Sequence, residues 1–410
     1  MTVGEGRPPA GRALLSTNTM IAFLVLGVSG AAIGPALPWM AEHWHVRLED
    51  AGVLFTMLFT GACVTVPLSG VLLDRVGRKP ILVAGLSLMG AGLAILGFAP
   101  DLAWAVGGTL VLGLGWGCLD VTLNVFVADL YPASREAALN LTNVAFGFGA
   151  LVGPLLVGVA LQLAATPQVV LLVLSVLGGV AALVFAFLVF PGRAVPAGPA
   201  PLTGPVLRQP YVLAAAAMFF LYVGLEIGFG GWAYSFAALG AHLDPAPAAL
   251  VVSTYWIAFT LGRAAAGLLS HRVAGAHLVL GGALLSAAGA AAVALAPGNA
   301  AVLFGGAVLL GAGFAPVFPT AFGLATARYP ATAGAVSSVL VMGGTLGGTV
   351  LPYLQGRLLA AGGVGATAAS IAVLALLVAG IQLMLGRMAV PPDLYPVSRE
   401  AGREYDIIGS

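Results

Sequence analysis

The stretch GVLLDRVGRKP, at residues 70–80, places four charged side chains between two long apolar runs. They are Asp74, Arg75, Arg78 and Lys79. Because charged groups are costly inside the hydrocarbon core of a bilayer, this stretch predicts a short turn at a membrane face. The apolar runs before and after it are then two membrane-spanning helices that the turn connects.

The composition of the whole chain also indicates a membrane protein. Of its 410 residues, 60% are hydrophobic and only 8% are charged, whereas a soluble domain is about 45–50% apolar and about 25% charged. Apolar runs of roughly 20 residues favour spanning helices over the alternating strands of an outer-membrane barrel. The net charge of +1 and the lack of a basic patch indicate no nucleic-acid partner.

Hydropathy predicts an all-α membrane protein with twelve transmembrane helices in two six-helix bundles. Residues 191–210 are rich in Pro, Gly and Ala and predict a loose cytoplasmic linker between the bundles. We therefore expect an N-terminal bundle at 1–190, a C-terminal bundle at 211–388 and a flexible cytoplasmic tail at 389–410. The predicted spans are 17–39, 51–73, 80–99, 103–128, 137–161, 168–190, 211–239, 248–270, 277–296, 300–326, 333–356 and 364–386.

The distribution of Lys and Arg predicts the orientation, because these residues favour cytoplasmic loops. Arg47 and Arg357 fall on one predicted side, and Arg263 falls inside a span. The others fall on the opposite side, which we expect to be cytoplasmic and to hold both termini. We expect a monomer in the lipid bilayer of a bacterial inner (plasma) membrane. The residues on the cytoplasmic side are Arg7, Arg12, Arg75, Arg78, Lys79, Arg135, Arg193, Arg208, Arg272, Arg328, Arg387, Arg399 and Arg403.

The two predicted bundles repeat each other in sequence. Tyr131-Pro132-Ala133 matches Tyr329-Pro330-Ala331 at an offset of 198 residues. Further matches keep the same order along the chain, which predicts two pseudo-symmetric halves. Gly70, Leu72, Arg75 and Val76 recur as Gly267, Leu269, Arg272 and Val273, and Gly149, Pro154 and Gly158 recur as Gly347, Pro352 and Gly356.

Three charged residues lie inside predicted spans: Asp120, Glu226 and Arg263. Charge in the bilayer interior is costly, so each of them is a candidate functional residue. Asp120 shares one helical face with Trp116 and Asn124, since the three are spaced by four residues. The alternative for Asp120 is a packing role, with the acid satisfied by neighbouring helices.

Polar and aromatic residues of other spans extend this set. Glu226 follows Tyr222 by one turn, and Trp256 and Arg263 share a face of the eighth span. Rings beside carboxylates and amides suit a polar, ring-shaped solute such as a monosaccharide. A structural ion pair between Glu226 and Arg263 is a rival hypothesis. The predicted substrate and coupling residues are Asp120, Asn124, Asn143, Glu226, Trp256 and Arg263.

The sequence has none of the patterns of an enzyme. We find no nucleophile–base pair, no metal-ligand spacing and no phosphate-binding loop on a strand. We therefore predict no catalytic residues, no cofactor and no metal. Cys63 and Cys118 fall inside predicted spans and are interpreted as packing residues.

The pattern Gly-x-x-x-Asp-Arg-x-Gly-Arg-Lys at residues 70–79 closely resembles the signature loop between helices 2 and 3 of the major facilitator superfamily. This resemblance implies two six-helix halves that rock about a site near the bilayer midplane. It implies that Asp74 caps helix 11, because a helix N-terminus favours a carboxylate. Arg75 and Arg78 would reach an acid at the end of helix 4. The gating residues expected from it are Gly70, Asp74, Arg75, Arg78 and Asp129.

Other stretches resemble the fucose permease branch, the fucose:proton symporters. Residues 117–124, Gly-Cys-Leu-Asp-Val-Thr-Leu-Asn, are similar to its helix 4, and Tyr222-Val-Gly-Leu-Glu226 is similar to its helix 7. That branch has an acid in helix 1, where this chain has Gly34. Proton coupling would then rest on Asp120, because a buried carboxylate can exchange a proton near neutral pH. Coupling to Na⁺, which a carboxylate with amide oxygens could also hold, and simple facilitation are the alternatives.

A motif in the fifth predicted span favours a second hypothesis. Gly149-x-x-x-Gly153-Pro154-x-x-x-Gly158 partly resembles the Gly-Pro motif of drug:proton antiporters. Drug or metabolite efflux by proton antiport is therefore the alternative function. The main prediction is a secondary transporter that imports a sugar or related solute with protons.

Overall fold

A computed structural model of the chain describes residues 10–131, 135–190, 208–329 and 332–388. The predicted tail at 389–410, and nearly all of the predicted linker at 191–210, lie outside the described residues. Within helices, some side chains are also left undescribed. They include three that the sequence analysis singled out: Gly70, Asp74 and Asn143.

The described part of the chain is helical throughout and contains no strand. The first half has six long helices and one short one, which precedes the second span. These elements are α1 (Ala10–His43), α2 (Leu48–Ala51), α3 (Val53–Val76), α4 (Arg78–Gly97), α5 (Leu102–Leu130), α6 (Arg135–Gln162) and α7 (Pro167–Phe187).

The second half repeats this series of long helices. One of its spans is interrupted, and its last two spans are continuous with each other. These elements are α8 (Pro210–Gly240), α9 (Pro245–Leu269), α10 (Gly275–Leu295), α11 (Ala300–Phe314), α12 (Val317–Arg328) and α13 (Ala333–Arg387).

Eleven described helical stretches are long and apolar enough to cross a membrane. One of them joins α11 to α12 across Ala315 and Pro316, where the proline cannot donate a backbone hydrogen bond. The 55-residue α13 changes direction at Gly363, whose φ of 72° favours glycine. Counted as two spans, α13 brings the total to twelve, which confirms the predicted architecture.

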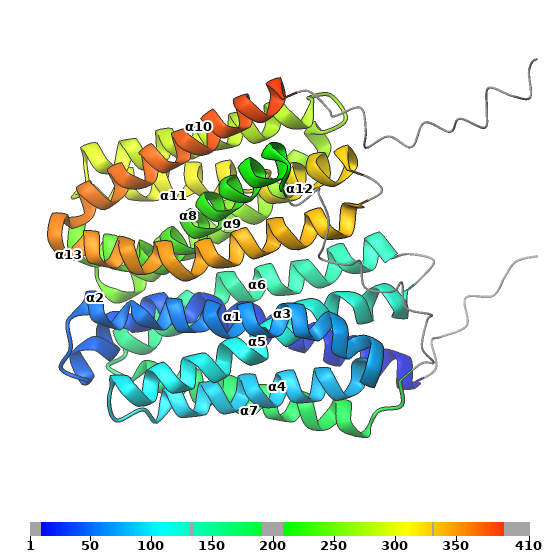
Figure 1. Cartoon of the computed structure of the whole chain (residues 1–410). Coiled ribbons are helices and arrows are strands. Elements are labelled where there is room, and N and C mark those ends of the chain that lie inside the picture. The colour runs from blue at the N-terminus through cyan, green and yellow to red at the C-terminus, as the bar shows by residue number, and fades with distance from the viewer. Residues whose placement is uncertain (1–9, 132–134, 191–207, 330–331, 389–410) are drawn as a thin grey trace, which may run out of the picture.

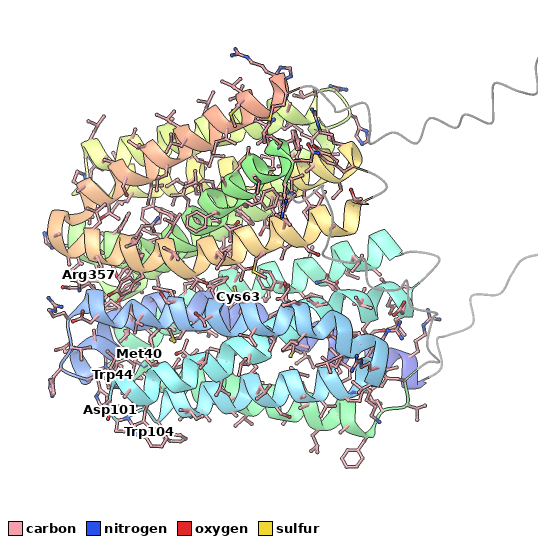
Figure 2. All side chains as sticks on the ribbon, in the orientation of Figure 1. Met40, Trp44, Cys63, Asp101, Trp104 and Arg357 are labelled. Atoms are coloured by element: carbon pink, nitrogen blue, oxygen red, sulfur yellow. The ribbon has the colours of Figure 1, made fainter. Side chains whose placement is uncertain are left out.

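The two halves lie side by side with their helices running between the same two ends (Figure 1). At one end, called here the terminal end, α1 begins and α13 finishes. The opposite end, called the α2 end, holds α2 together with Trp44, Asp101, Trp104 and Arg357 (Figure 2). The functional residues can therefore be placed by half and by end.

Large apolar side chains cover the outside of the bundle. Val176 is 65% exposed, Leu268 is 75% exposed and Leu295 is 87% exposed. Soluble monomers rarely leave large contiguous apolar patches open to water, whereas lipid tails are as apolar as these side chains. The surface is thus suited to the bilayer that the composition predicts.

Candidate functional site

The second half contributes a cluster of polar and aromatic side chains from α8 and α9. Tyr222 and Glu226 lie one turn apart on α8, and the hydroxyl of Tyr255 donates a hydrogen bond of 3.1 Å to the backbone oxygen of Glu226. On α9, the rings of Trp256 and Phe259 meet edge to face with centroids 5.6 Å apart. The hydrogen bond from Tyr255 joins α9 to α8 and so fixes the relative position of the side chains in the cluster.

Two polar groups of this cluster are buried and have no hydrogen-bond partner in the part of the chain that the structure describes. They are the hydroxyl of Tyr222 and the indole nitrogen of Trp256. A buried polar group without a partner costs free energy, of the order of 1–3 kcal/mol. Both groups are therefore available to a bound solute or to water.

Glu226 and Arg263 form no ion pair within 4.0 Å in the described structure, although their charges act on each other. The guanidinium carbon of Arg263 instead lies 4.4 Å from the ring centroid of Phe259. The structural ion pair that was the rival hypothesis is thus not formed. The Glu226 carboxylate is half-buried and lies one turn from the Tyr222 hydroxyl on α8.

The first half contributes a second cluster from α5. The ring of Trp116 packs against α1 at Gly30, where an added β-carbon would lie 2.4 Å from it, and meets Phe146 of α6 edge to face at 6.3 Å. The amide nitrogen of Asn124 donates to the backbone oxygen of Asp120 at 2.7 Å. One amide proton of Asn124 is therefore already used within its own helix.

The Asp120 carboxylate makes no hydrogen bond or ion pair with the described side chains, and it is accessible from outside the protein. Such a position allows a carboxylate to meet both water and a solute.

Contacts between the halves occur near both clusters. A β-carbon at Gly34 of α1 would lie 2.3 Å from the backbone oxygen of Gly231 on α8. One at Gly147 of α6 would lie 3.1 Å from the hydroxyl of Thr260 on α9. Thr260 follows Trp256 by one turn, and Gly147 follows Asn143 by one turn. The turn of α6 that follows the predicted residue Asn143 thus approaches α9, while the side chain of Asn143 is not described.

The expected gating residues lie at the terminal end. Arg78 of α4 forms an ion pair with Asp129 of α5, and both side chains are largely buried. Lys79 donates a 3.0 Å hydrogen bond to the backbone oxygen of Leu188. Arg75 is exposed, and the surroundings of Gly70 and the side chain of Asp74 are outside the description. The Arg78–Asp129 pair joins two helices of the same half and does not itself connect the halves.

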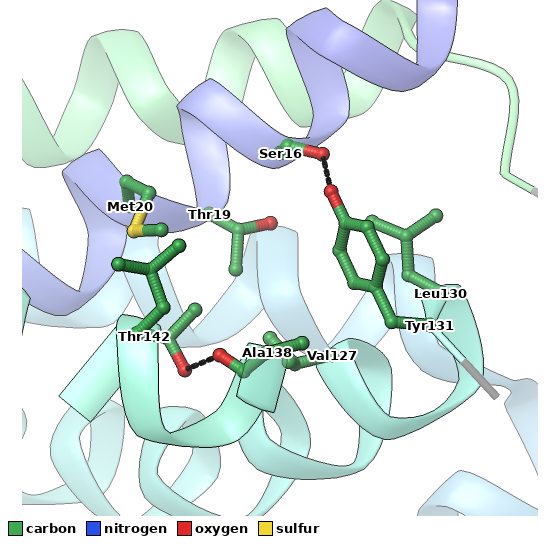
Figure 3. Close-up of a pocket in the computed structure, with 9 residues that line it drawn as sticks. Ser16, Thr19, Met20, Val127, Leu130, Tyr131, Ala138 and Thr142 are labelled. Carbon is green, nitrogen blue, oxygen red and sulfur yellow. Dashed lines mark hydrogen bonds between the residues drawn. The ribbon is translucent and has the colours of Figure 1, made fainter. Parts of the chain in front are cut away.

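A cavity of about 250 Å³ lies at the terminal end of the first half, between α1, α5 and α6 (Figure 3). Its hydroxyls are already bonded: Ser16 to Tyr131, Thr19 to the oxygen of Leu15, and Thr142 to the oxygen of Ala138. The cavity therefore suits an apolar occupant. The sequence analysis did not anticipate it, because it contains no charged residue. Its lining is Ser16, Thr19, Met20, Val127, Leu130, Tyr131, Ala138, Leu141 and Thr142.

Comparisons with known sequences point to one family. A family model described as the Major Facilitator Superfamily matches residues 19–274. An uncharacterised MFS-type transporter of Yersinia pestis is 25% identical over 330 residues, which are 80% of this chain and 84% of that protein. The sodium-dependent glucose transporter 1A of Mus musculus is 24% identical over 373 residues, which cover 82% of this chain and 88% of that protein.

Solved structures show the same fold. The crystal structure of the nucleoside transporter NupG has a TM-score of 0.77 at 12% identity and covers 93% of this chain and all of its own. A bacterial homologue of the lysosomal transporter Spinster, in an inward-facing and unoccupied conformation, has a TM-score of 0.73 at 15% identity and covers 93% of this chain and 98% of its own. Because the family model matches more than half of the chain, this protein belongs to the Major Facilitator Superfamily of membrane transporters.

Proposed function

We propose that this transporter carries a small polar solute, most simply a monosaccharide, together with protons, by alternating access. The observation that supports this proposal is the pair of clusters on the two halves. One offers the carboxylate of Asp120. The other offers the carboxylate of Glu226 and the two buried groups without partners, on Tyr222 and Trp256.

The chemistry of these groups fits a sugar better than an ion or a lipid. The Tyr222 hydroxyl and the Trp256 indole N–H can donate to oxygens of a solute, and the carboxylate of Glu226 can accept from its hydroxyls. The half-buried ring of Trp256 offers a flat apolar face for the C–H side of a sugar ring. A site with a few placed polar groups on apolar walls is typical of small-molecule recognition.

Asp120 is the proposed coupling residue. Its carboxylate has no described partner, so it can take up and release a proton without breaking an ion pair. Residues 20–40 of α1 contain no acid that could share this role, and Gly34 stands at the position where the fucose permease branch has one. Asn124, Asn143 and Arg263 are proposed as further contacts of the solute.

The comparisons support a sugar without deciding the ion. The mouse relative is named for glucose and for sodium, so Na⁺ is the second coupling ion to test. The fucose permease branch remains part of the proposal on the similarity of residues 117–124 and 222–226. The proposed setting is a monomer in the inner membrane of a bacterium, with both termini in the cytoplasm.

Drug or metabolite efflux by proton antiport is the second candidate, and one observation favours it. The cavity at the terminal end is apolar, and its hydroxyls are already bonded. An apolar cargo could bind there, because it needs no hydrogen-bond partner from the lining. The Gly149–Gly158 motif of α6 is consistent with this alternative.

Proton flux in proteoliposomes tests the proposal. Purified protein is reconstituted, and the external pH is followed on adding each of a panel of monosaccharides that includes fucose and glucose, with and without Na⁺. Alkalinisation of the outside with one sugar, lost in Asp120→Asn, is the expected result. Asp101→Asn is the matched control. Asp101 is the N-cap of α5, the helix that contains Asp120, and Asn also caps helices well.

Two other outcomes would change the conclusion. Uptake of a labelled sugar that requires Na⁺ and produces no pH change would replace the proton by sodium. The third possible result is that no sugar changes the external pH, whereas cationic dyes cause proton movement under an imposed proton gradient. This result would overturn the sugar proposal in favour of efflux.

A further inference from the structure

We propose that Asp50 is the shared acceptor of an ion-pair latch that holds the two halves together at the α2 end. The latch consists of Arg47, Glu49 and Asp50 from the first half and Arg357 from the second. The inference rests on the proposed function only in assuming that the halves rock against each other. It adds the residues that stabilise one of the two end states.

Both arginines of the latch bond to one carboxylate, that of Asp50. Arg357 of α13 approaches Asp50 with Nη1 3.1 Å from Oδ1. Arg47 approaches the same group with Nε 2.8 Å from Oδ2 and Nη2 3.0 Å from Oδ1. This two-point contact is the arrangement that makes arginine–carboxylate pairs directional. Asp50 thus bonds to both halves at once.

The fold of the first half prepares this carboxylate before Arg357 reaches it. Arg47 and Asp50 lie at the two ends of the first turn of α2, and the backbone N–H of Asp50 donates to the oxygen of Arg47 at 3.0 Å. Arg47 also pairs with Glu49 at 3.1 Å. Because these contacts are local, they persist when the halves separate. Only the Asp50–Arg357 pair must break.

The charges of the chain support a specific role for these arginines. Arg47 and Arg357 are the two basic residues that the sequence places on the side opposite the loops rich in Lys and Arg. Although they are 310 positions apart in the chain, both contact Asp50. A basic residue at this face is therefore used for pairing rather than for orientation in the membrane.

Below the latch, the halves meet in a buried contact that a rocking motion must also separate. The ring of Phe55 on α3 meets the ring of Trp232 on α8 at 5.7 Å, and Trp232 is fully buried. The hydroxyl of Thr56 donates to the backbone oxygen of Thr349 on α13 at 2.8 Å. The described state is thus closed at the α2 end.

The contact of the halves on the opposite side of the bundle is built differently. There, the backbone N–H of Ala246 on α9 lies 3.5 Å from the side-chain oxygen of Gln162 on α6. The hydroxyl of Ser253 donates to the backbone oxygen of Leu151 at 2.8 Å. No ion pair joins α6 to α9 among the described residues. The charged latch therefore acts on the other side, where α2 and α3 meet α13.

Distances between spin labels test the latch in the full-length protein in lipid nanodiscs, without solute or ion gradient. The background is Cys63→Ser with Cys118→Ala, which removes both native thiols. Labels at Glu42→Cys and Ala361→Cys report the α2 end across the halves, since both positions are exposed. Labels at Pro80→Cys and His271→Cys report the terminal end across the halves.

The expected result is a shift of population in Asp50→Asn and in Arg357→Gln. Because the pair is half-exposed, loss of the ion pair should favour the state open at the α2 end by about two- to fivefold. The terminal end should close in the same proportion. The double variant Asp50→Asn with Arg357→Gln should shift no further than Asp50→Asn alone, since the two residues act through one contact.

Two controls make the result specific. Arg47→Gln should shift the population less than Arg357→Gln, because Arg47 belongs to the same half as Asp50. Labels at Glu42→Cys and Trp104→Cys lie within the first half and should keep their distance in every variant. Unchanged distances across the α2 end in Asp50→Asn and Arg357→Gln would overturn the latch. A failed transport assay would not, because these measurements need no cargo.

Discussion

Gly34 of α1 lies against the backbone of Gly231 on α8, and a β-carbon at Gly34 would come within 2.3 Å of the Gly231 oxygen. The atoms in the way belong to the main chain, so a side chain cannot be accommodated by a rotamer change. Gly34 is the position where the fucose permease branch has an acid. In this state the protein has no room for such an acid, which is consistent with the proposal that Asp120 is the coupling residue.

Gly34→Ala should therefore destabilise the state closed at the α2 end. Overpacking of this kind costs typically about 1–3 kcal/mol, because α1 and α8 must move apart. We expect a lower midpoint of thermal unfolding in detergent and slower transport. Gly107→Ala is the matched control on α5, since an added β-carbon there meets nothing within 4 Å. Equal stability of the two variants would show that the α1–α8 contact is looser than described.

The helices could be predicted from the sequence because the residues within each span are enough to determine that it is helical. A run of about 20 apolar residues between charged or Pro-rich turns leaves the backbone no other way to satisfy its hydrogen bonds in lipid. The break between α11 and α12 at Pro316, and the continuity of α13 through Gly363, depend on how spans pack and turn. Hydropathy therefore predicted them as ordinary spans.

The side-chain contacts of the candidate site could be predicted less completely than the helices. They depend on the direction in which each side chain turns and on residues that are far apart in the chain. The spacing of four residues predicts that Asp120 and Asn124 share one helical face. It does not predict that the Asn124 amide turns back to the backbone oxygen of Asp120. Opposite charges suggested a Glu226–Arg263 pair, whereas Arg263 lies over Phe259. The Asp50–Arg357 pair spans 307 positions, and no local pattern connects residues so far apart.

The Arg78–Asp129 pair provides a prediction about the terminal end. The side chains are 16% and 24% exposed, so removing one charge leaves the other poorly solvated. Arg78→Gln and Asp129→Asn should each cost about 1–3 kcal/mol, between the values for exposed and buried pairs. The double variant should cost less than the sum of the single ones. Strict additivity in thermal unfolding would mean that the two residues do not support each other.

Trp256→Phe tests whether the indole N–H serves the solute. Phenylalanine keeps an aromatic face but removes the donor, and a neutral hydrogen bond is worth about 0.5–1.5 kcal/mol. The half-saturation concentration for counterflow should then rise by roughly two- to twelvefold. Trp256→Leu, which also removes the ring, should raise it further. No change in Trp256→Phe would mean that the solute leaves this nitrogen unpaired.

Tyr222→Phe separates a binding role from a purely internal one. The hydroxyl is buried without a described partner, so its removal should raise the midpoint of thermal unfolding of the empty protein. If the solute pairs with it, the same variant should bind the solute more weakly. Greater stability with unchanged half-saturation would limit Tyr222 to packing against Phe314, whose ring centroid lies 5.8 Å from its own.

Asp120 can be tested by comparing three side chains at one position. Asp120→Asn keeps the size of the side chain but cannot exchange a proton, so accumulation against a gradient should be lost while exchange of solute down its own gradient continues. Asp120→Glu keeps the carboxylate, and glutamate is the residue of the similar helix in the fucose permease branch, so it should retain accumulation. Uptake of labelled solute under an imposed pH gradient, beside counterflow without one, measures both quantities. Because Asn124 bonds to the backbone oxygen of Asp120 and not to its carboxylate, none of these changes should disturb the helix. Accumulation that survives in Asp120→Asn would move the coupling site to Glu226, the other carboxylate inside a predicted span.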